Sequence, residues 1–426
     1  MCDSVVAVGA ETSSGTTLFA KNSDRKEREC QPFLQFSEAS HPPQARTRCT
    51  HIEIPQVAET YRVMGHSPWW VWGFEHGVNE HAVAIGNHAV FSKELLEPTP
   101  GLIGMDLVRL GLERGRTARE ALEVIATLVE SYGQGGSALA PGEGGYHNSF
   151  LLADPSEAWI LETSNRRWVA RGTRLDAVSN HFSMGVDWEI SSRDLESFAR
   201  AHGWWSSAGR VDVAAAYRES RIPGFVSEGR QGRARELLRA GRGRHDVAGF
   251  QRLLSDHLHG GLVWHGEGKL DEERFWTLCA HSDPVSWTTA SLIAPLPADS
   301  SAPWPVWIAF ATPCTGIFLP VYLDGVLPPA LARGGEGPDP ESAWWAFKRL
   351  QDAAAADWAR HTPLLREAWA EFEDEVEAER KTAEASARAA SVDGDRDAAA
   401  LIVSDFMART VEDAMKRAEM LRARLA

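Results

Sequence analysis

The sequence has few cysteines and no long apolar run. Its 5 cysteines among 426 residues are Cys2, Cys30, Cys49, Cys279 and Cys314. They form no CxxC pair and are too sparse for a disulfide scaffold, which favours a reducing compartment. No apolar run reaches the roughly 18 residues that cross a bilayer, and the first residues lack the basic and long apolar segments of a secretory leader. We therefore expect a cytoplasmic protein with no membrane partner.

The sequence also lacks an excess of basic residues. It has 44 Lys and Arg against 59 Asp and Glu, a formal net charge of −15 at pH 7. Because phosphate binding needs a concentrated basic face, we expect no nucleic-acid partner. Hydrophobic residues make up 43% and charged residues 24%, so the chain is globular and long enough to bury a sizeable core.

What the sequence does have is an unusual beginning. Met1-Cys2-Asp3 leads into an apolar run ending at Val8, a polar turn around Gly15, a second strand-like run ending at Ala20, and then Lys21-Asn22-Ser23-Asp24-Arg25. This pattern predicts a β-hairpin. Methionine aminopeptidase removes Met before small residues, so Cys2 would carry both a thiol and a free α-amine.

A thiol beside its own amine is suited to nucleophilic catalysis. Their reference pKa values are roughly 8.5 and roughly 7.7–8.0, so the amine can take the thiol proton near neutral pH. A nearby cation favours the thiolate, and the hairpin would bring Lys21 close to Cys2. Asp24 would then orient Lys21 or hold the α-amine.

Several ordered motifs carry a family resemblance. The N-terminal pattern resembles the secernin group of the C69 dipeptidase family, within the N-terminal nucleophile hydrolases, and the similarity covers roughly the first 330 residues. The acylases and bile-salt hydrolases carry Arg at the position of Lys21. Secernin-like sequences carry Lys there, as this chain does. The further motifs are Trp69-Trp70-Val71-Trp72-Gly73, Gly77-Val78-Asn79-Glu80-His81, Ile85-Gly86-Asn87, His147-Asn148-Ser149-Phe150, Ala153-Asp154-Pro155-Ser156-Glu157-Ala158-Trp159 and Ser179-Asn180-His181.

The resemblance implies an α+β fold, a four-layer αββα sandwich of two antiparallel sheets, over residues 2–330. It implies that Asn87 and Asn180 stabilise the oxyanion, and that no metal or organic cofactor is needed. By comparison with the acylases, Arg233 or Arg235 is a candidate clamp for a substrate carboxylate. Three arginines in six residues are also typical of a solvated helix start.

Periodicity predicts the elements around these motifs. Helices are expected over 102–112 and 118–130, the second capped at Thr117, and a strand over 82–85 that ends at Asn87. Further strands are expected over 148–153, 158–162, 168–171, 176–179, 275–281, 287–294 and 306–311, and a helical block over 192–259. The glycine-rich stretch 133–145 is expected to be a loop or a lid over a cleft.

Two features admit two interpretations each. The indole cluster that includes Trp72 could pack in the core or form a wall of a substrate cleft. The group His257, His259, His265, Cys279 and His281 suggests a metal site, but its spacings match no usual zinc-binding pair, so we expect no metal.

The composition shifts to Ala, Glu, Arg and Trp after the glycines at 334–337, and the pattern predicts a helical hairpin extension over residues 338–426. Its apolar residues form a rough stripe, typical of helices that dock on the core or on a second copy of the chain. A homo-oligomer formed through these helices is therefore one expectation.

The predicted function is a cysteine-type dipeptidase that cleaves small peptides or other linear amides through an acyl-enzyme on Cys2. Two alternatives remain open at this point. The chain could be an acyltransferase of the same fold, or a non-catalytic secernin-like adaptor.

Overall fold

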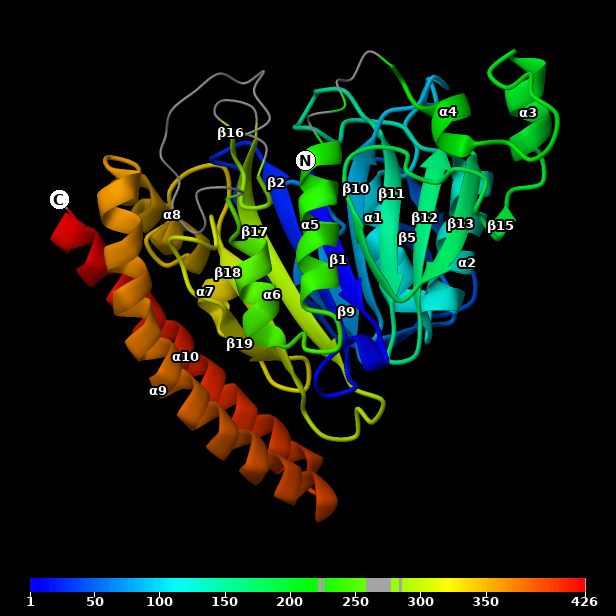
Figure 1. The fold of residues 1–426 in the computed structure, drawn as a ribbon. Helices are drawn as coiled ribbons and strands as arrows, with labels where there is room; N and C mark the ends of the chain where they lie inside the picture. Colours follow the sequence, from blue (N-terminus) through cyan, green and yellow to red (C-terminus); the bar gives the residue numbers. More distant parts are fainter. Residues whose placement is uncertain (221–223, 225–226, 258–276, 283–285, 426) are drawn as a thin grey trace.

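The computed structural model describes residues 1–220, 224, 227–257, 277–282 and 286–425. Within these residues the chain forms two large sheets and two small two-stranded ones, in which all strand pairs are antiparallel. The two large sheets stack face to face with helices outside (Figure 1). The predicted four-layer αββα sandwich is therefore confirmed.

The first large sheet contains the chain's N-terminus. Its seven strands follow the order β14-β1-β2-β17-β18-β19, with β16 also paired to β17. The predicted N-terminal hairpin is present, and its second strand continues through Arg25. The bounds are β1 Cys2–Ala7, β2 Thr17–Arg25, β14 Leu175–Val178, β16 His281–Ser282, β17 Ser286–Leu296, β18 Pro305–Phe310 and β19 Leu319–Tyr322.

The second large sheet has eight strands in the order β15-β13-β12-β11-β10-β9-β8-β3. The predicted meander from 148 to 171 forms its centre. Its bounds are β3 Phe33–Phe36, β8 Val63–His66, β9 His76–Asn79, β10 Ala84–Val90, β11 His147–Ala153, β12 Ala158–Ser164, β13 Arg167–Thr173 and β15 Ile190–Ser191. The small sheets pair β4 Ala39–Ser40 with β7 Glu59–Thr60, and β5 Arg46–Arg48 with β6 Glu53–Pro55.

Helices cover the outer face of each sheet. Helices α1 (Gly104–Arg114) and α2 (Ala118–Tyr132) pack on the second sheet, and Thr117 caps α2 by accepting a hydrogen bond from the Glu120 N–H, as predicted. Helices α5 (Glu228–Ala240) and α6 (Val247–Leu254) pack on the first sheet. The short helices are η1 Gly9–Glu11, α3 Leu195–Ala201, α4 Val213–Tyr217 and α7 Pro329–Ala332.

The C-terminal helices share the core of the sandwich. They are α8 (Ala343–Ala354), α9 (Trp358–Val392) and α10 (Arg396–Leu425). Trp369 and Phe406 are fully buried and belong to the same apolar cluster as Val6 between the sheets. Figure 1 shows α9 and α10 running side by side along the β19 edge. Docking on the core is therefore confirmed, and Leu401 and Met420 remain exposed.

Two features differ from the sequence-based expectations. Asn87 lies inside β10, opposite Phe150 of β11, and not at a strand end, because the strand continues to Val90. Residues 277–280 form no strand, because the Asn22 side chain binds the Leu278 carbonyl and only His281 and Ser282 pair with β17. Residues 275 and 276 of that expected strand lie outside the described residues.

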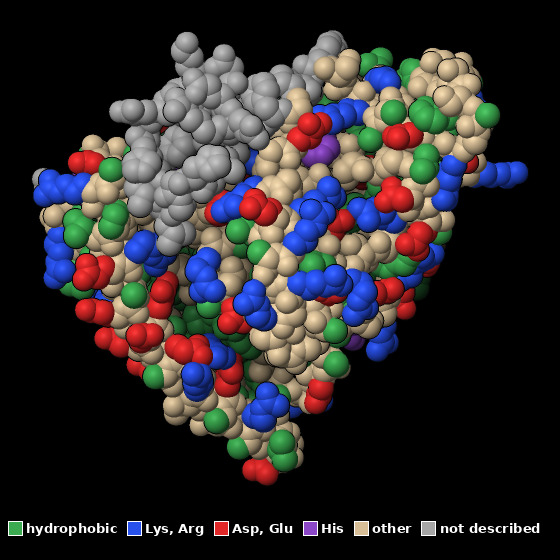
Figure 2. Space-filling view, viewed as in Figure 1, with side chains coloured by type: hydrophobic (Ala, Val, Ile, Leu, Met, Phe, Trp, Pro, Cys, Tyr) green, Lys and Arg blue, Asp and Glu red, His purple; other side chains and the backbone are tan. Residues whose placement is uncertain are grey.

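The charged side chains are distributed over the surface. On the face shown in Figure 2, Lys and Arg side chains alternate with Asp and Glu side chains over the described helices. No helix in the described part of the chain is long and apolar enough to cross a membrane.

Candidate active site

The register of β1 and β2 places Cys2 on the inner face of the first sheet. Cys2 lies opposite Ser23, and Ser4 lies opposite Lys21. Directly opposed residues share a face, and alternate residues along a strand point the same way. Val6 packs between the two sheets, so Cys2 and Lys21 also face the second sheet.

A buried carboxylate just before β9 of the second sheet meets this pair. Glu75 Oε2 lies 3.8 Å from Cys2 Sγ and 3.2 Å from Lys21 Nζ, and Glu75 Oε1 lies 3.1 Å from Arg25 Nη1. Arg25 also binds Glu29 at 2.6 Å. The thiol therefore lies beside an alternating set of two cations and two carboxylates.

Burial and charge oppose each other in this cluster. Burial would raise the pKa of Glu75, but the Lys21 and Arg25 charges outweigh it and hold that pKa below 4.5. Burial also raises the pKa of the Cys2 thiol, and Lys21 opposes that rise. Since Cys2 is only 4% exposed, the thiol is in its neutral form unless a base takes its proton.

The backbone nitrogen of Cys2 has its own binding site. It donates to Asn180 Oδ1 at 2.8 Å, and Arg230 Nη2 donates to the same oxygen at 2.6 Å. Asn180 Nδ2 donates to the Ala89 carbonyl at 2.9 Å. The oxygen of Asn180, and not its N–H, therefore faces Cys2, which suits a residue that holds the future α-amine.

Two further carboxylates complete this side of the site. Arg230 lies 3.4 Å from Asp3 and 3.5 Å from Asp24, and Asp24 also accepts from Thr288 Oγ1 at 2.7 Å. Burial raises the pKa of Asp24 to about 6, against the lowering effects of the N-terminal ammonium and Arg230. Asp24 thus holds Arg230, whereas Lys21 pairs with Glu75.

The Met1 amine, one residue before Cys2, binds two oxygen acceptors. It donates to the Asp24 carbonyl oxygen at 2.5 Å and to Ser286 Oγ at 3.3 Å. Met1 itself is half-buried. Its removal would leave the Asp24 carbonyl oxygen and Ser286 Oγ without this ammonium.

Asn87 approaches Glu75 from strand β10. Its Nδ2 donates to Asn148 Oδ1 at 3.1 Å. With the amide turned over, that nitrogen lies 3.0 Å from Glu75 Oε2, the same oxygen that contacts the Cys2 thiol. Asn87 therefore lies beside the carboxylate that contacts the thiol.

The candidate binding residues from the sequence lie elsewhere. Arg233 makes a two-point contact with Asp256 at 2.9 and 3.1 Å, and Arg235 binds Asp176 at 2.7 Å. Trp72 packs on the core outside the second sheet and under the Arg109 guanidinium, 4.0 Å from its ring centre. The arginine that enters the site is Arg230, and the core interpretation of Trp72 is the one the packing supports.

Sequence reasoning missed Arg230 and Glu75. A signal for Arg230 was available, because Ala234 and Leu238 define the buried stripe of α5 and residue 230 is one helical step before them. Glu75 is a charged residue between Phe74 and His76 in a buried strand entry. A charge there needs a buried partner, but the sequence does not show that the partner is Lys21.

The glycine-rich stretch contacts the site through Arg25. Arg25 Nη1 donates to the Ala138 carbonyl at 3.0 Å, and Nη2 donates to the Leu139 carbonyl at 3.1 Å. Tyr146, at the end of the stretch, lies 3.4 Å from the same guanidinium. The predicted loop is thus anchored to the cation that binds Glu75.

Comparison with protein-family models assigns the chain to a family. Residues 1–222 match the model of peptidase family C69, which is 222 of the 426 residues. The chain belongs to peptidase family C69. Membership makes this C69 protein a hydrolase, in agreement with the resemblance seen in the sequence.

Solved structures similar to the C69 chain come from several organisms. A C2A mutant of conjugated bile acid hydrolase from Clostridium perfringens is 13% identical, with a TM-score of 0.45, covering 76% of this chain and 94% of that one. Penicillin V acylase from Agrobacterium tumefaciens is 15% identical, with a TM-score of 0.43, covering 75% and 86%. An N-acylethanolamine-hydrolyzing acid amidase orthologue from Caenorhabditis elegans is 11% identical, with a TM-score of 0.36 and a coverage of 70% and 95%.

Proposed function

We propose that this C69 protein is a cysteine-nucleophile dipeptidase that hydrolyses small linear peptides or amides after Met1 has been removed. The observation that carries the proposal is that both the thiol and the backbone nitrogen of Cys2 have buried polar partners. Its thiol lies beside the Lys21–Glu75 pair, and its backbone nitrogen is held by Asn180 at 2.8 Å. A nucleophile, a base and an orienting group thus meet at one residue.

The proposed mechanism uses the α-amine of Cys2 as the base. The amine takes the thiol proton, the sulfur attacks the substrate carbonyl carbon, and the amine then gives that proton to the leaving nitrogen. A water molecule hydrolyses the thioester and restores the thiol. Asn180 orients the amine, and Lys21 favours the thiolate electrostatically.

Asn87 is the proposed donor to the oxyanion. An amide N–H can meet the developing negative charge without titrating. In the turned-over orientation its nitrogen lies beside the carboxylate oxygen that touches the thiol, so a substrate carbonyl that displaces this contact would receive the same hydrogen bond.

The position of the Met1 amine supports a substrate with a free α-ammonium group. In the chain as it stands, an ammonium one residue away from Cys2 binds the Asp24 carbonyl and Ser286 Oγ. After removal of Met1, the ammonium of a dipeptide's first residue can occupy this position while its carbonyl lies at the thiol. Cys2 is only 4% exposed, and the loop carbonyls of Ala138 and Leu139 bind Arg25, so the site favours a small substrate.

A substrate comparison tests this proposal. Turnover of a dipeptide library should require Cys2, so Cys2→Ala should abolish it while the unfolding temperature is kept. Free dipeptides should be cleaved and their N-acetylated forms rejected. Ser286→Ala removes one hydrogen bond to the ammonium, worth about 1.5–3 kcal/mol, and should raise KM about tenfold or more for free dipeptides.

Three results would overturn the proposal. They are full activity in Cys2→Ala, preference for N-acetylated substrates, and no turnover by protein that has lost Met1. Added amine or thiol acceptors separate hydrolysis from acyl transfer, because a transferase would form the acyl-acceptor product in place of the free acid. An unreactive Cys2 in processed protein would favour the adaptor interpretation.

A further inference from the structure

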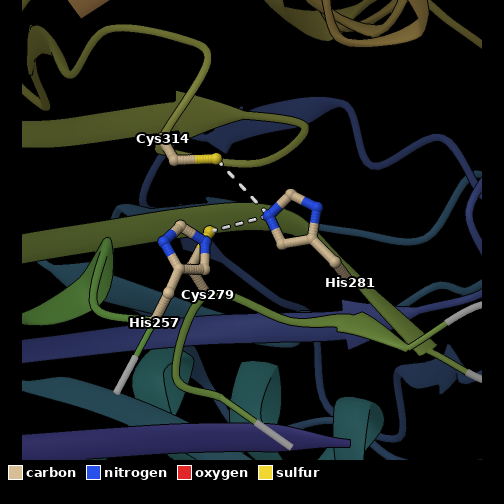
Figure 3. Close-up of side chains that lie close together, drawn as sticks. All are labelled: His257, Cys279, His281 and Cys314. Atoms are coloured by element: carbon tan, nitrogen blue, oxygen red, sulfur yellow. Dashed lines mark hydrogen bonds between the residues drawn. The ribbon is translucent and has the colours of Figure 1, made fainter. Parts of the chain in front are cut away.

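Four buried side chains of the kinds that bind metal ions lie close together, apart from the residues of the proposed active site. They are His257, Cys279, His281 and Cys314, with ligand atoms all within 4.8 Å of one another. Figure 3 shows the two sulfur atoms and the His257 ring turned toward one nitrogen of His281. Each side chain is at most 4% exposed.

The cluster is assembled from separate segments of the chain. His257 follows the end of α6, Cys279 and His281 lie at the entry to β16, and Cys314 lies in the loop between β18 and β19. Cys314 lies 33 residues after His281, which is why local spacing could not reveal the set. Of the histidines considered in the sequence, His259 and His265 lie outside the described residues.

We propose that His257, Cys279, His281 and Cys314 bind one zinc ion in a closed Cys2His2 site. Zinc is bound tetrahedrally by thiolate at about 2.3 Å and by imidazole at about 2.0–2.1 Å, which places sulfur and nitrogen ligands about 3.5 Å apart. The His281 Nε2 atom lies 3.5 Å from Cys279 Sγ and 3.4 Å from Cys314 Sγ. These two sulfur–nitrogen distances already match the separation expected between ligands of a tetrahedral zinc ion.

Charge also favours a divalent ion at this position. Two thiolates and two neutral imidazoles around Zn²⁺ sum to zero net charge, so the loaded site can be buried without an uncompensated ion. Aromatic rings surround it, since the Trp358 and Trp287 ring centres lie 4.7 and 5.1 Å from that of His281. Four protein ligands leave no coordination position for a substrate, so the site is structural.

The contacts of the cluster lead back to the active site. The Ala280 N–H, between two of the ligands, donates to Thr288 Oγ1 at 2.8 Å, and Thr288 Oγ1 donates to Asp24 at 2.7 Å. Asn22 of β2 binds the Leu254 and Leu278 carbonyls at 2.8 and 2.7 Å. The ion would therefore fix the segments that position Asp24 and, through Arg230, Asn180.

Metal analysis of the full-length protein tests the proposal directly. The protein is purified without chelators under reducing conditions, dialysed with zinc, freed of excess metal and measured by inductively coupled plasma mass spectrometry. We expect about one zinc per chain, and an X-ray absorption spectrum that fits two sulfur and two nitrogen ligands. Cobalt-exchanged protein should show the thiolate charge-transfer and tetrahedral ligand-field bands.

Matched cysteine variants locate the site. Cys314→Ala and Cys279→Ala should lose the metal, whereas Cys30→Ala, also a buried cysteine, should keep it. Less than a tenth of an equivalent of zinc in the wild-type protein would overturn the proposal. So would a ligand shell without sulfur, a Cys279–Cys314 disulfide that persists under reduction, or unchanged zinc in Cys314→Ala. The wild-type spectra decide the question even where a variant fails to fold.

Discussion

Glu75 is the residue whose replacement tests the electrostatics of the site most sharply. In Glu75→Gln the side chain keeps its shape but no longer neutralises Lys21 and Arg25, which lie 3.2 and 3.1 Å away. Lys21 is fully buried, whereas Arg25 keeps Glu29. Breaking a buried pair by removing one partner costs about 3–5 kcal/mol, so we expect the free energy of unfolding at pH 7 to fall by about that amount.

The same substitution should make the Cys2 thiol more acidic. Glu75 raises the thiol pKa across 3.8 Å, and two unit charges about 4 Å apart interact by about 4 kcal/mol at an effective dielectric constant of 20. Since one pKa unit corresponds to about 1.4 kcal/mol, the upper limit of the fall is about three units. With relaxation of the neighbours we expect a fall of about one to three units.

The assay is the pH dependence of alkylation at Cys2, read by peptide mapping after short exposures to iodoacetamide. Glu29→Gln is the matched control, because Glu29 also binds Arg25, at 2.6 Å, while Glu75 remains at the thiol. The Cys2 inflection should move to lower pH in Glu75→Gln and stay within half a unit in the control. An unchanged or higher inflection in Glu75→Gln would refute the reasoning.

The free energy of unfolding of the wild-type protein should also depend on the ionisation of Glu75 at acidic pH. The Glu75 pKa is held below its usual 4.5, so its contribution is present above that pH and is lost as the pH falls through the folded-state pKa. In Glu75→Gln this loss of stability below pH 4.5 should be absent when the free energy of unfolding is measured in urea at a series of pH values. If both proteins lose stability in parallel below pH 4.5, the carboxylate is not held by Lys21 and Arg25.

Three further predictions concern other contacts of the described residues. Asn87→Ala should lower kcat by about 10²–10³ with little change in unfolding temperature, and a loss under threefold would remove Asn87 from the mechanism. Arg230→Met leaves Asp3 and Asp24 buried without their cation and should cost about 3–5 kcal/mol, against about 1 kcal/mol for Arg233→Met, which breaks a more exposed pair. The Asp24 pKa of about 6 lies above its usual 3.8, so its ionisation opposes folding, and the Arg230→Met penalty measured in urea should be larger at pH 8 than at pH 5. Trp369→Ala removes a fully buried indole that also donates to the Thr315 carbonyl at 3.0 Å and should cost about 3–5 kcal/mol, whereas the exposed Leu364→Ala in the same helix should change unfolding by less than about 0.5 kcal/mol.

Much of the fold was predictable because it depends on local sequence patterns. Alternation and turn residues located the hairpin of Cys2 and the meander of β11 to β13, and helical spacing with the Thr117 cap located α2. The pairing of β2 with β17 joins segments more than 250 residues apart, and only the family resemblance implied the double sheet. The expected strand end at Asn87 was wrong, because β10 continues past Gly86, where the close approach of the Lys21 side chain leaves room only for a glycine.

The candidate site was predictable to a smaller extent. Cys2 and Lys21 follow from one hairpin, so the sequence places them together. Glu75 comes from the loop before β9, Arg230 from the outer helix α5 and Asn180 from just after the end of β14, which pairs with β1, so their meeting around Cys2 depends on the tertiary structure. The cluster of His257, Cys279, His281 and Cys314 has the same origin, since three chain segments meet only in the folded protein.

The central claim is that Cys2, freed of Met1, is the reactive nucleophile. The most direct measurement is intact mass spectrometry of the purified protein before and after a stoichiometric thiol-reactive probe built on a dipeptide, followed by peptide mapping. The account predicts that Met1 is absent and that the probe labels Cys2 in preference to Cys30, Cys49, Cys279 and Cys314. Retained Met1, or labelling of Cys2 no faster than of the other cysteines, would contradict it.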